Sequence, residues 1–315
     1  MKTETGIEIS FEPDSVRVTE IRDEWRLRRP RYAGSPFLEK PSLSPPYAPG
    51  RLRPEYVADG LAVLNFARWL AGLPADVEID PRLAVQAQHG AVLLHRIGCL
   101  CHTPSRPSDM PKAFYAIGYA STSTSNIHAS FGATTSLEQA VLGFLDDSDP
   151  SNIDKVGHRR WILNPAMRYT AFGYAGDEES SFITLQAFDQ TRKDVFIPFV
   201  AWPAEGMFPI SFFGADQAWS VSLDPRAFDA RRSNPSVALT SIGDGRVWKF
   251  PGTGGASYHF STDRTGYGQP FCLVFRPDGV MAYFPGSRWR VEIAGLVDPE
   301  GKPSSLAYEV EFFPL

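Results

Sequence analysis

At 315 residues, the chain exceeds the length of one ordinary compact domain and is long enough for two. Hydrophobic residues make up 43% and charged residues 21%, a globular composition that excludes a disordered or fibrous chain. The formal net charge is −5, and no run of lysine and arginine alternates with aromatic residues. The composition therefore argues against nucleic acid as a partner.

The sequence contains no apolar stretch near the roughly 20 residues that a membrane-spanning helix needs. Residues 1–15 lack the apolar core of a signal peptide, so we expect a soluble, untargeted chain. A mature form that begins with an added methionine would look the same, so the compartment stays open.

The three cysteines, Cys99, Cys101 and Cys272, cannot build a disulfide framework, because at most one bridge could close. Cys99 and Cys101 are too close in sequence for an unstrained bridge to each other. We expect these two side chains to be half-buried thiols that pack as small hydrophobic groups.

The segment 12–50 is rich in proline, and the prolines of its second half exclude a continuous helix or a central strand there. We interpret it as an extended arm. Because Trp25, Tyr32, Phe37 and Tyr47 give it large apolar side chains, we expect the arm to dock on a domain and not to be free.

Two helices are predicted next. The first begins near Pro54, which suits a first helical turn, and ends at Gly72. Asp80 is a good N-cap for the second helix, with Pro81 in its first turn and Gly98 at its end.

Prolines and a serine- and threonine-rich tract predict that residues 104–126 are mostly loop, with His102 at its start. A third helix follows, and Thr135 and Glu138 have the spacing of a capping box at its beginning. This helix leads into an acidic loop that contains Asp147.

Beyond residue 161, short β-branched and aromatic runs at 169–174 and 181–188 predict strands beside the helices. After residue 196 no long helical period remains, and short apolar runs alternate with glycine, proline and aspartate. This pattern favours a β-sandwich in the C-terminal part.

The clearest chemical signal is the string Gly157-His158-Arg159-Arg160-Trp161. A single histidine is more often a hydrogen-bonded structural residue than a ligand, so the string alone does not define a site. We find no Gly-x-Ser-x-Gly elbow and no phosphate-binding loop. We expect the two arginines and the tryptophan to anchor the segment by ion pairs and packing.

Several segments, in this order, resemble the CAP superfamily (cysteine-rich secretory protein, antigen 5, pathogenesis-related 1). They are residues 64–74, 80–91, 98–102 and 140–147, followed by Gly157-His158. The Gly-His-Arg-Arg-Trp form, together with the segment 32–50 and the β-rich tail, is most similar to a bacterial branch of that superfamily.

The resemblance implies an α+β fold, with an α-β-α sandwich CAP domain at residues 51–195. The extended arm would be residues 1–50. The all-β domain would be residues 196–315, a sandwich that could be immunoglobulin-like.

Carried over residue by residue, the resemblance makes His102 and His158 the two cavity histidines and Asp147 an acidic cavity residue. These three are the candidate catalytic residues. The family's Gly-Glu-Asn segment would fall at residues 118–126, which contain no acid. This departure weakens a catalytic interpretation, because acid–base chemistry needs both titrating groups in place.

Two facing imidazoles could hold a divalent metal such as zinc through His102 and His158. The alternative is a hydrogen-bonded histidine pair without a metal. No other cofactor is expected.

The leading hypothesis is a bacterial, secreted or extracytoplasmic binding protein whose histidine-lined cleft takes a small ligand or peptide. One alternative is a peptidase-like hydrolase that uses the pair His102 and His158, or a histidine with Asp147, with or without metal. Another is an envelope- or spore-associated scaffold with a protein or cell-envelope partner.

Overall fold

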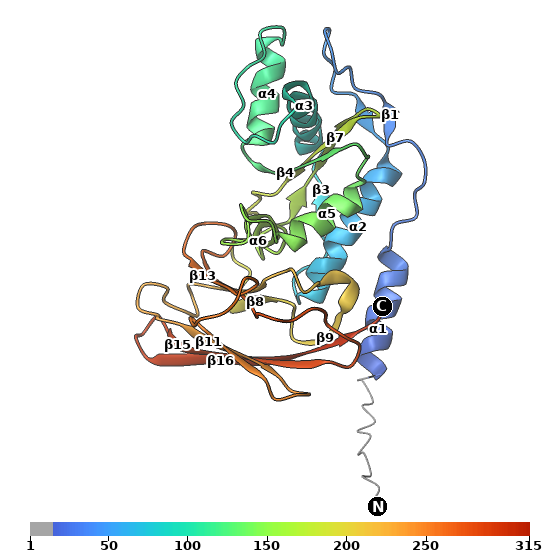
Figure 1. The fold of residues 1–315 in the computed structure, drawn as a ribbon. Helices are drawn as coiled ribbons and strands as arrows, with labels where there is room; N and C mark the ends of the chain where they lie inside the picture. The colour runs from blue at the N-terminus through green and yellow to red at the C-terminus, as the bar shows by residue number, and fades with distance from the viewer. Residues whose placement is uncertain (1–14) are drawn as a thin grey trace, which may run out of the picture.

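The computed structural model describes residues 15–315. Figure 1 shows three layers at one end of the molecule and two larger sheets at the other end. The central layer is a three-stranded sheet with the order β4-β7-β6 (Ser125–Phe131, Ser180–Gln186, Phe172–Gly176). Helices α3 (Pro81–Ile97) and α4 (Lys112–Thr122) cover one face, while α2 (Pro54–Leu70) and α5 (Leu137–Asp146) lie at the other.

Strand β7 shows why the sheet is covered on both faces. Successive side chains of a strand point to opposite faces. Phe182 packs into a cluster with Leu94 of α3, whereas Ile183 and Leu185 belong to the cluster that contains α2 and α5. Strand β7 is therefore a central strand buried on both sides, and its polar residues Ser181, Thr184 and Gln186 are buried as well.

The two helices predicted from their end signals are confirmed. The Asp80 carboxylate accepts hydrogen bonds from the N–H groups of Arg82 and Leu83, and Pro81 opens α3. Gly98 follows the last residue of α3 with a φ of 70°, a left-handed conformation that favours glycine.

The prediction of an extended arm is wrong in part. Residues 15–28 form helix α1 (Ser15–Arg28), and the beginning of the predicted arm lies outside the described residues. No proline interrupts this stretch, and its acidic and basic side chains pair at i,i+3 and i,i+4 spacings. Val18 and Ile21 are buried, so tertiary packing supplies the rest of the stabilisation.

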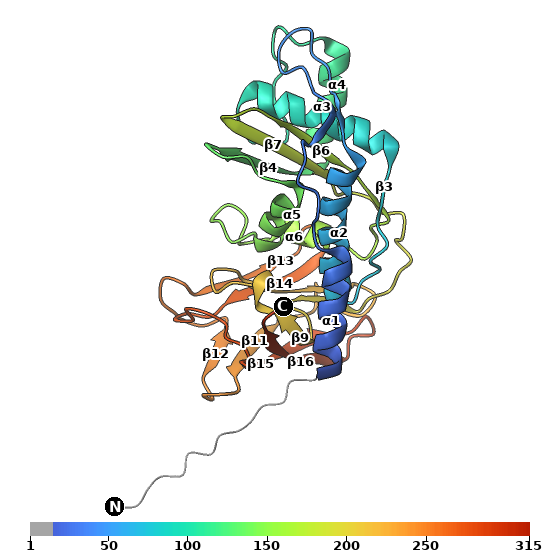
Figure 2. The ribbon, with the colours of Figure 1, turned by 90° about the vertical axis from the view of Figure 1, so that its right-hand side faces the viewer.

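The aromatic anchors of this segment do dock on the molecule, as predicted. Trp25 lies 4.9 Å from Phe66 of α2, measured between ring centroids. After α1 the chain is extended, and β1 (Phe37–Glu39) pairs with β2 (Arg51–Leu52). Figure 2 shows α1 beside the C-terminal sheets and in line with α2.

The predicted loop at 104–126 is wrong, because it contains α4 and the start of β4. The prolines end before Lys112, and the following residues are free to form a helix. Gly118 allows α4 to approach α3 closely, since a Cβ there would lie 3.0 Å from the carbonyl oxygen of His89. His102 itself lies in a non-helical segment between α3 and α4.

The predicted capping box is displaced by one residue. Ser136 caps α5 by accepting from the N–H of Gln139, whose side chain accepts from the N–H of Ser136. Glu138 lies within the first turn, and Thr135 precedes the cap. Both pairs have a suitable residue type and spacing, so local sequence does not separate them.

The C-terminal part, residues 199–313, consists mainly of antiparallel β-sheet, as predicted. One sheet has the order β13-β14-β10-β8 and the other β12-β11-β15-β16-β9. Its strands are β8 (Phe199–Trp202), β9 (Gly206–Pro209), β10 (Trp219–Leu223), β11 (Ser236–Ser241), β12 (Val247–Phe250), β13 (His259–Asp263), β14 (Phe271–Arg276), β15 (Arg288–Val297) and β16 (Pro303–Phe313). Ring contacts between Trp219 of β10 and Phe312 of β16 connect the two sheets. An immunoglobulin-like topology stays a prediction.

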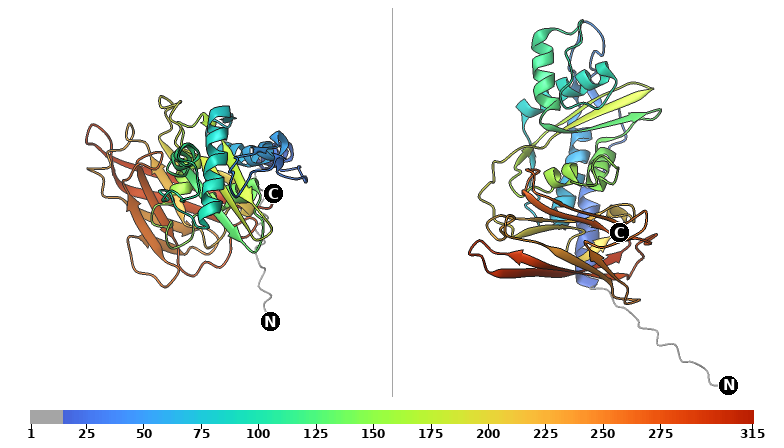
Figure 3. Two further views of the ribbon diagram at one scale, coloured as in Figure 1. Left: turned by 90° about the horizontal axis from the view of Figure 1, so that it is seen from above. Right: turned by 60° about the vertical axis from the view of Figure 1, so that its left-hand side comes forward.

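The remaining elements are short, and the two parts of the chain share one apolar core. Helix α6 (Gly157–Ile162) and strands β3 (Glu78–Ile79) and β5 (Tyr169–Thr170) belong to the helical part, and a short 3₁₀ helix (Ile210–Phe212) to the C-terminal part. One buried apolar cluster runs from α1 through α2 to β16, so the cores are continuous. The right-hand view of Figure 3 shows the green helical segment that contains α5 and α6 between the central sheet and the C-terminal sheets. The boundaries at residues 50 and 195 stay predictions.

Within residues 15–315, none of the helices combines the length and apolarity that crossing a membrane requires. Of the cysteines, Cys99 is exposed, Cys101 is half-buried and Cys272 is buried, and all three are free thiols. The prediction of a half-buried thiol is therefore confirmed for Cys101 and wrong for Cys99.

Candidate functional site

A pocket of about 260 Å³ lies where α6, the start of β4 and a C-terminal loop meet. We call it the histidine pocket, because two of its lining residues are the histidines singled out from the sequence. Its lining comprises His102, Ser123, Ser125, Asn126, Ser151, Asn152, Lys155, Gly157, His158, Trp161, Phe188 and Tyr267.

His158 is oriented by a buried carboxylate. Its Nδ1 lies 2.8 Å from Oδ1 of Asp147, a residue that is 3% exposed. Asp147 ends α5 in a left-handed conformation, with a φ of 50°, and its Oδ2 accepts from the N–H of Arg159. Both carboxylate oxygens are thus engaged, and an ionised carboxylate accepts only, so Nδ1 of His158 carries the proton.

His102 is oriented by the end of α4. Its Nδ1 donates to the backbone carbonyl of Thr122 at 2.8 Å, and the Thr122 hydroxyl donates back to the carbonyl of His102 at 3.0 Å. A carbonyl can only accept, which fixes the proton of neutral His102 on Nδ1. In the neutral form of both histidines Nε2 is then a lone-pair acceptor, and no residue within 15–315 hydrogen-bonds to either one.

The segment that lacks the expected acid supplies neutral groups to the pocket instead. Ser125 is 2% exposed and accepts a hydrogen bond from the side-chain amide of Gln186 at 2.8 Å. The Asn126 amide donates to the carbonyl of His158 at 2.9 Å and so holds α6 against β4. Among the residues that the structure describes, no acidic side chain lines the pocket, since Asp147 lies behind His158.

One side of the pocket is aromatic. Trp161 and Phe188 are stacked with ring centroids 4.1 Å apart, and Tyr267 meets the indole edge-on at 6.3 Å. Tyr267 comes from the loop between β13 and β14. Gly157 leaves room for the Tyr267 ring, because a Cβ on Gly157 would lie 2.9 Å from Cδ1 of Tyr267. The C-terminal part therefore completes the pocket.

The two arginines after His158 fasten the helical part to the C-terminal sheets. Arg159 is fully buried and donates to the carbonyls of Leu145, Asp146 and Ala218, and to the Ser220 hydroxyl. Burial lowers the pKa of Arg159 to about 10, which leaves it charged at neutral pH.

Arg160 forms a second fastening. It pairs with Asp263 of β13 and donates to the carbonyls of Thr265 and Gln269. The predicted anchoring role of the arginines is confirmed. Trp161 is an anchor too, but it also lines the pocket.

The donor set falls short of a zinc site. Catalytic zinc takes about three protein ligands and structural zinc four. The pocket offers two imidazole Nε2 atoms, and both oxygens of Asp147 are already used. Within residues 15–315 no group of three or more histidine, cysteine, aspartate or glutamate side chains could hold a metal. We therefore derive no chemistry through zinc.

A third histidine lies close behind the pocket. His128 of β4 meets the Phe144 ring edge-on at 6.1 Å, and Phe144 also contacts the His158 ring at 5.3 Å. Burial, with a smaller contribution from the charge of His158, lowers the pKa of His128 below its ordinary value. Burial also lowers the pKa of His89 and of His259.

These three histidines predict acid sensitivity. Their folded-state pKa values lie below the unfolded value of about 6.5, so the unfolded chain binds more protons as the pH falls. The stability that they contribute is complete above pH 6.5 and is lost as the pH falls through their folded pKa values. We expect the urea midpoint to decrease between pH 7.5 and 5.5, and His128→Gln to reduce that decrease.

The carboxylates do not account for this effect. Asp76, Asp149 and Asp263 have pKa values held below 3.8, so their contributions are lost only in more acidic solution. An unfolding midpoint that does not change over the pH window would contradict the prediction.

Sequence reasoning found three residues of this site and missed most of the lining. His102 and His158 line one pocket, and Asp147 contacts His158. Lys155 and Phe188 flank predicted elements but carry no local signal of a site. Tyr267 lies between two glycines in a C-terminal loop, a context that reads as a turn.

The fold and site define the class of protein: a three-layer α-β-α domain with a histidine pocket at one end of its sheet. Residues 61–188 match the model of the cysteine-rich secretory protein family (CAP), and this part of the chain is a CAP domain. Comparison of the chain with curated proteins finds no match.

Proposed function

We propose that the histidine pocket binds a small polar ligand, a free molecule or the end of a peptide, and that the chain is a binding protein. The observation that supports this most is the matched anchoring of His102 and His158. Each ring holds its proton on Nδ1 against an oxygen and keeps Nε2 open as an acceptor. Preformed pockets with a few fixed polar groups are typical of ligand sites.

A fragment screen tests the proposal. We expect polar fragments detected by ligand-observed NMR to bind the full chain and to lose binding in the His102→Ala, His158→Ala double variant. His95→Ala is the matched control, because His95 also contacts a carboxylate, that of Asp177 at 3.0 Å, but lies outside the pocket. Fragment binding that survives the double variant would place the binding site elsewhere.

Zinc is a further probe of the same two nitrogens. We propose only weak zinc binding through His102 and His158, because two imidazoles supply half of a tetrahedral set. Calorimetric titration should show a small heat that disappears in the double variant. An undiminished heat in that variant would exclude the pair as the metal site.

A hydrolase is the second candidate, and the hydrogen bond between His158 and Asp147 is the observation that favours it. A carboxylate that orients an imidazole is the arrangement of a general base. Turnover of ester or peptide substrates that falls by about 10²–10⁴ in His158→Ala would establish this alternative. We expect no such turnover, because Asp147 lies behind His158 and no acidic side chain from residues 15–315 lines the pocket itself as a second titrating group.

CAP proteins are typically secreted, and we extend this location to the chain as a bacterial, extracytoplasmic protein. An envelope- or spore-associated scaffold is the structural alternative. Fractionation of the cells that produce the chain would distinguish a free extracytoplasmic protein from a bound one.

A further inference from the structure

We propose that the histidine pocket is a saccharide site whose ligand is the ring of a sugar acid. This inference rests on the proposed function and names the ligand class. A pyranose ring presents an apolar C–H face and a rim of hydroxyl groups. The pocket has aromatic side chains for the C–H face and polar side chains for the hydroxyl groups. Lys155 can pair with the carboxylate of a sugar acid.

The aromatic side matches the apolar face of a sugar ring. Phe188 is 43% exposed, and its ring is supported from behind by the stacked Trp161. Tyr267, half-buried, closes the same side. Large apolar surfaces held rigidly at a polar pocket are suited to a ligand with an apolar face.

The polar residues of the lining carry hydrogen-bond acceptors that are already oriented. The carboxylate of Asp149 accepts from the Ser151 hydroxyl and from the Asn152 amide. These bonds use the hydroxyl proton of Ser151 and one of the two amide N–H groups of Asn152, and they leave both side-chain oxygens as acceptors.

The other polar groups of the pocket also donate within the protein and leave an acceptor atom for the ligand. Asn126 donates one amide N–H to the backbone carbonyl of His158, and its side-chain oxygen has no donor among residues 15–315. The Ser123 hydroxyl donates to the carbonyl of Ala120. Together with Nε2 of His102 and of His158, these atoms form a surface that requires donors from the ligand, and the hydroxyl groups of a sugar supply them.

The charge of the pocket selects the type of sugar. Of the lining residues in the described part of the chain, Lys155 is the one lysine, arginine, aspartate or glutamate, and its Nζ lies 5.9 Å from the centroid of the Tyr267 ring. Lys155 forms no ion pair with any residue of the described chain. An acceptor-rich wall alone would also suit an ammonium or guanidinium group, but Lys155 repels a cation and attracts a carboxylate.

The size of the pocket limits the ligand. At about 260 Å³ it lies below the roughly 300–1,000 Å³ that is usual for drug-sized molecules. We therefore expect one ring to be held inside, with further units of an oligosaccharide outside.

Ligand-observed NMR on the full chain provides the test, with glucuronate and galacturonate as acids, glucose and galactose as neutral sugars, and argininamide as a cation. We expect the acids to bind about tenfold more tightly than the neutral sugars. Lys155→Gln should abolish this preference while neutral-sugar binding persists. Phe188→Ala should weaken all sugars by about tenfold.

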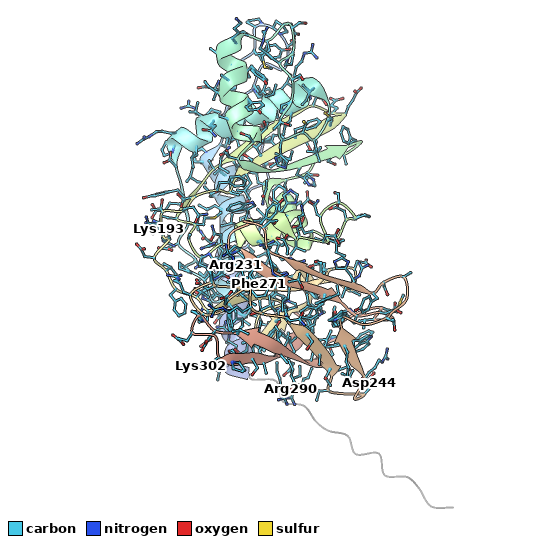
Figure 4. The ribbon with its side chains drawn as sticks, turned by 90° about the vertical axis from the view of Figure 1, so that its left-hand side faces the viewer. Lys193, Arg231, Asp244, Phe271, Arg290 and Lys302 are labelled. Carbon is cyan, nitrogen blue, oxygen red and sulfur yellow. The ribbon has the colours of Figure 1, made fainter. Side chains whose placement is uncertain are left out.

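Two controls accompany these variants. Lys193→Gln removes an exposed lysine outside the pocket, and Figure 4 shows that residue on the flank of the molecule. Phe131→Ala removes an aromatic ring that is 66% exposed at the other end of β4. Both should bind sugars as the unaltered chain does.

The outcomes separate the two proposals. Binding of polar fragments that depends on the histidines, without binding of any sugar, overturns the saccharide assignment and leaves the proposed function intact. Binding of argininamide in preference to the acids also overturns it. If neither sugars nor fragments bind, the proposed function itself fails.

Discussion

Replacing Arg159 with methionine is expected to destabilise the protein by about 4 kcal/mol or more. Methionine fills a similar volume but removes every donor of a guanidinium that is fully buried. The carbonyls of Leu145, Asp146 and Ala218 would lose their partner, and each buried acceptor without one costs about 1–3 kcal/mol. Since total stabilities are about 5–15 kcal/mol, urea denaturation should show a much lower midpoint or a partly unfolded chain.

Two further variants make this experiment specific. Arg159→Lys keeps the charge but not the forked donor geometry, so we expect an intermediate loss. Arg290→Met is the control, because Arg290 is exposed on β15 (Figure 4) and forms only a loose ion pair with Glu292. Exposed pairs contribute about 0–1 kcal/mol. A midpoint for Arg159→Met equal to that of Arg290→Met would refute the proposed fastening.

Gly173→Ala is expected to have the second large effect, a loss of about 3 kcal/mol. A Cβ on Gly173 of β6 would overlap the backbone carbonyl of Ala87 in α3. That carbonyl also accepts from the hydroxyl of Thr184 at 2.9 Å, so α3 is held at this distance from the sheet. The helix would have to move away and lose packing along its length.

The matched control for this variant is Gly243→Ala. Gly243 has open space around its Cβ position and no left-handed backbone. We expect the control to leave the unfolding midpoint unchanged, and thermal or urea unfolding can compare the two directly. Equal midpoints for the two variants would show that α3 adjusts without cost.

The helices that could be predicted from the sequence are those with local end signals. Asp80, Pro81 and Gly98 act within a few residues, so α3 was found with its correct ends. Helix α4 has a small-residue face at Gly118 that is stabilised by its neighbour α3, and such packing leaves no local pattern. Helix α1 could not be predicted, because its sequence is only weakly amphipathic and a proline-rich segment follows it.

The site divides in the same way. The motif around Gly157 led to His158, and the resemblance to CAP domains led to His102 and Asp147, whose functional roles stay predictions. The aromatic side of the pocket could not be predicted, because Tyr267 reaches Gly157 across more than one hundred residues of chain. Only the tertiary structure brings those two positions together.

The attachment of Arg159 and Arg160 to the β-rich part has a consequence for how such a chain can evolve. A recombination event could carry the CAP region into a new protein without the β-rich part. Arg159 and Arg160 would then lose their hydrogen-bond partners in that part, and the pocket would lose Tyr267. We therefore expect the two parts to be inherited together, with a sequence change on one side of their junction compensated on the other.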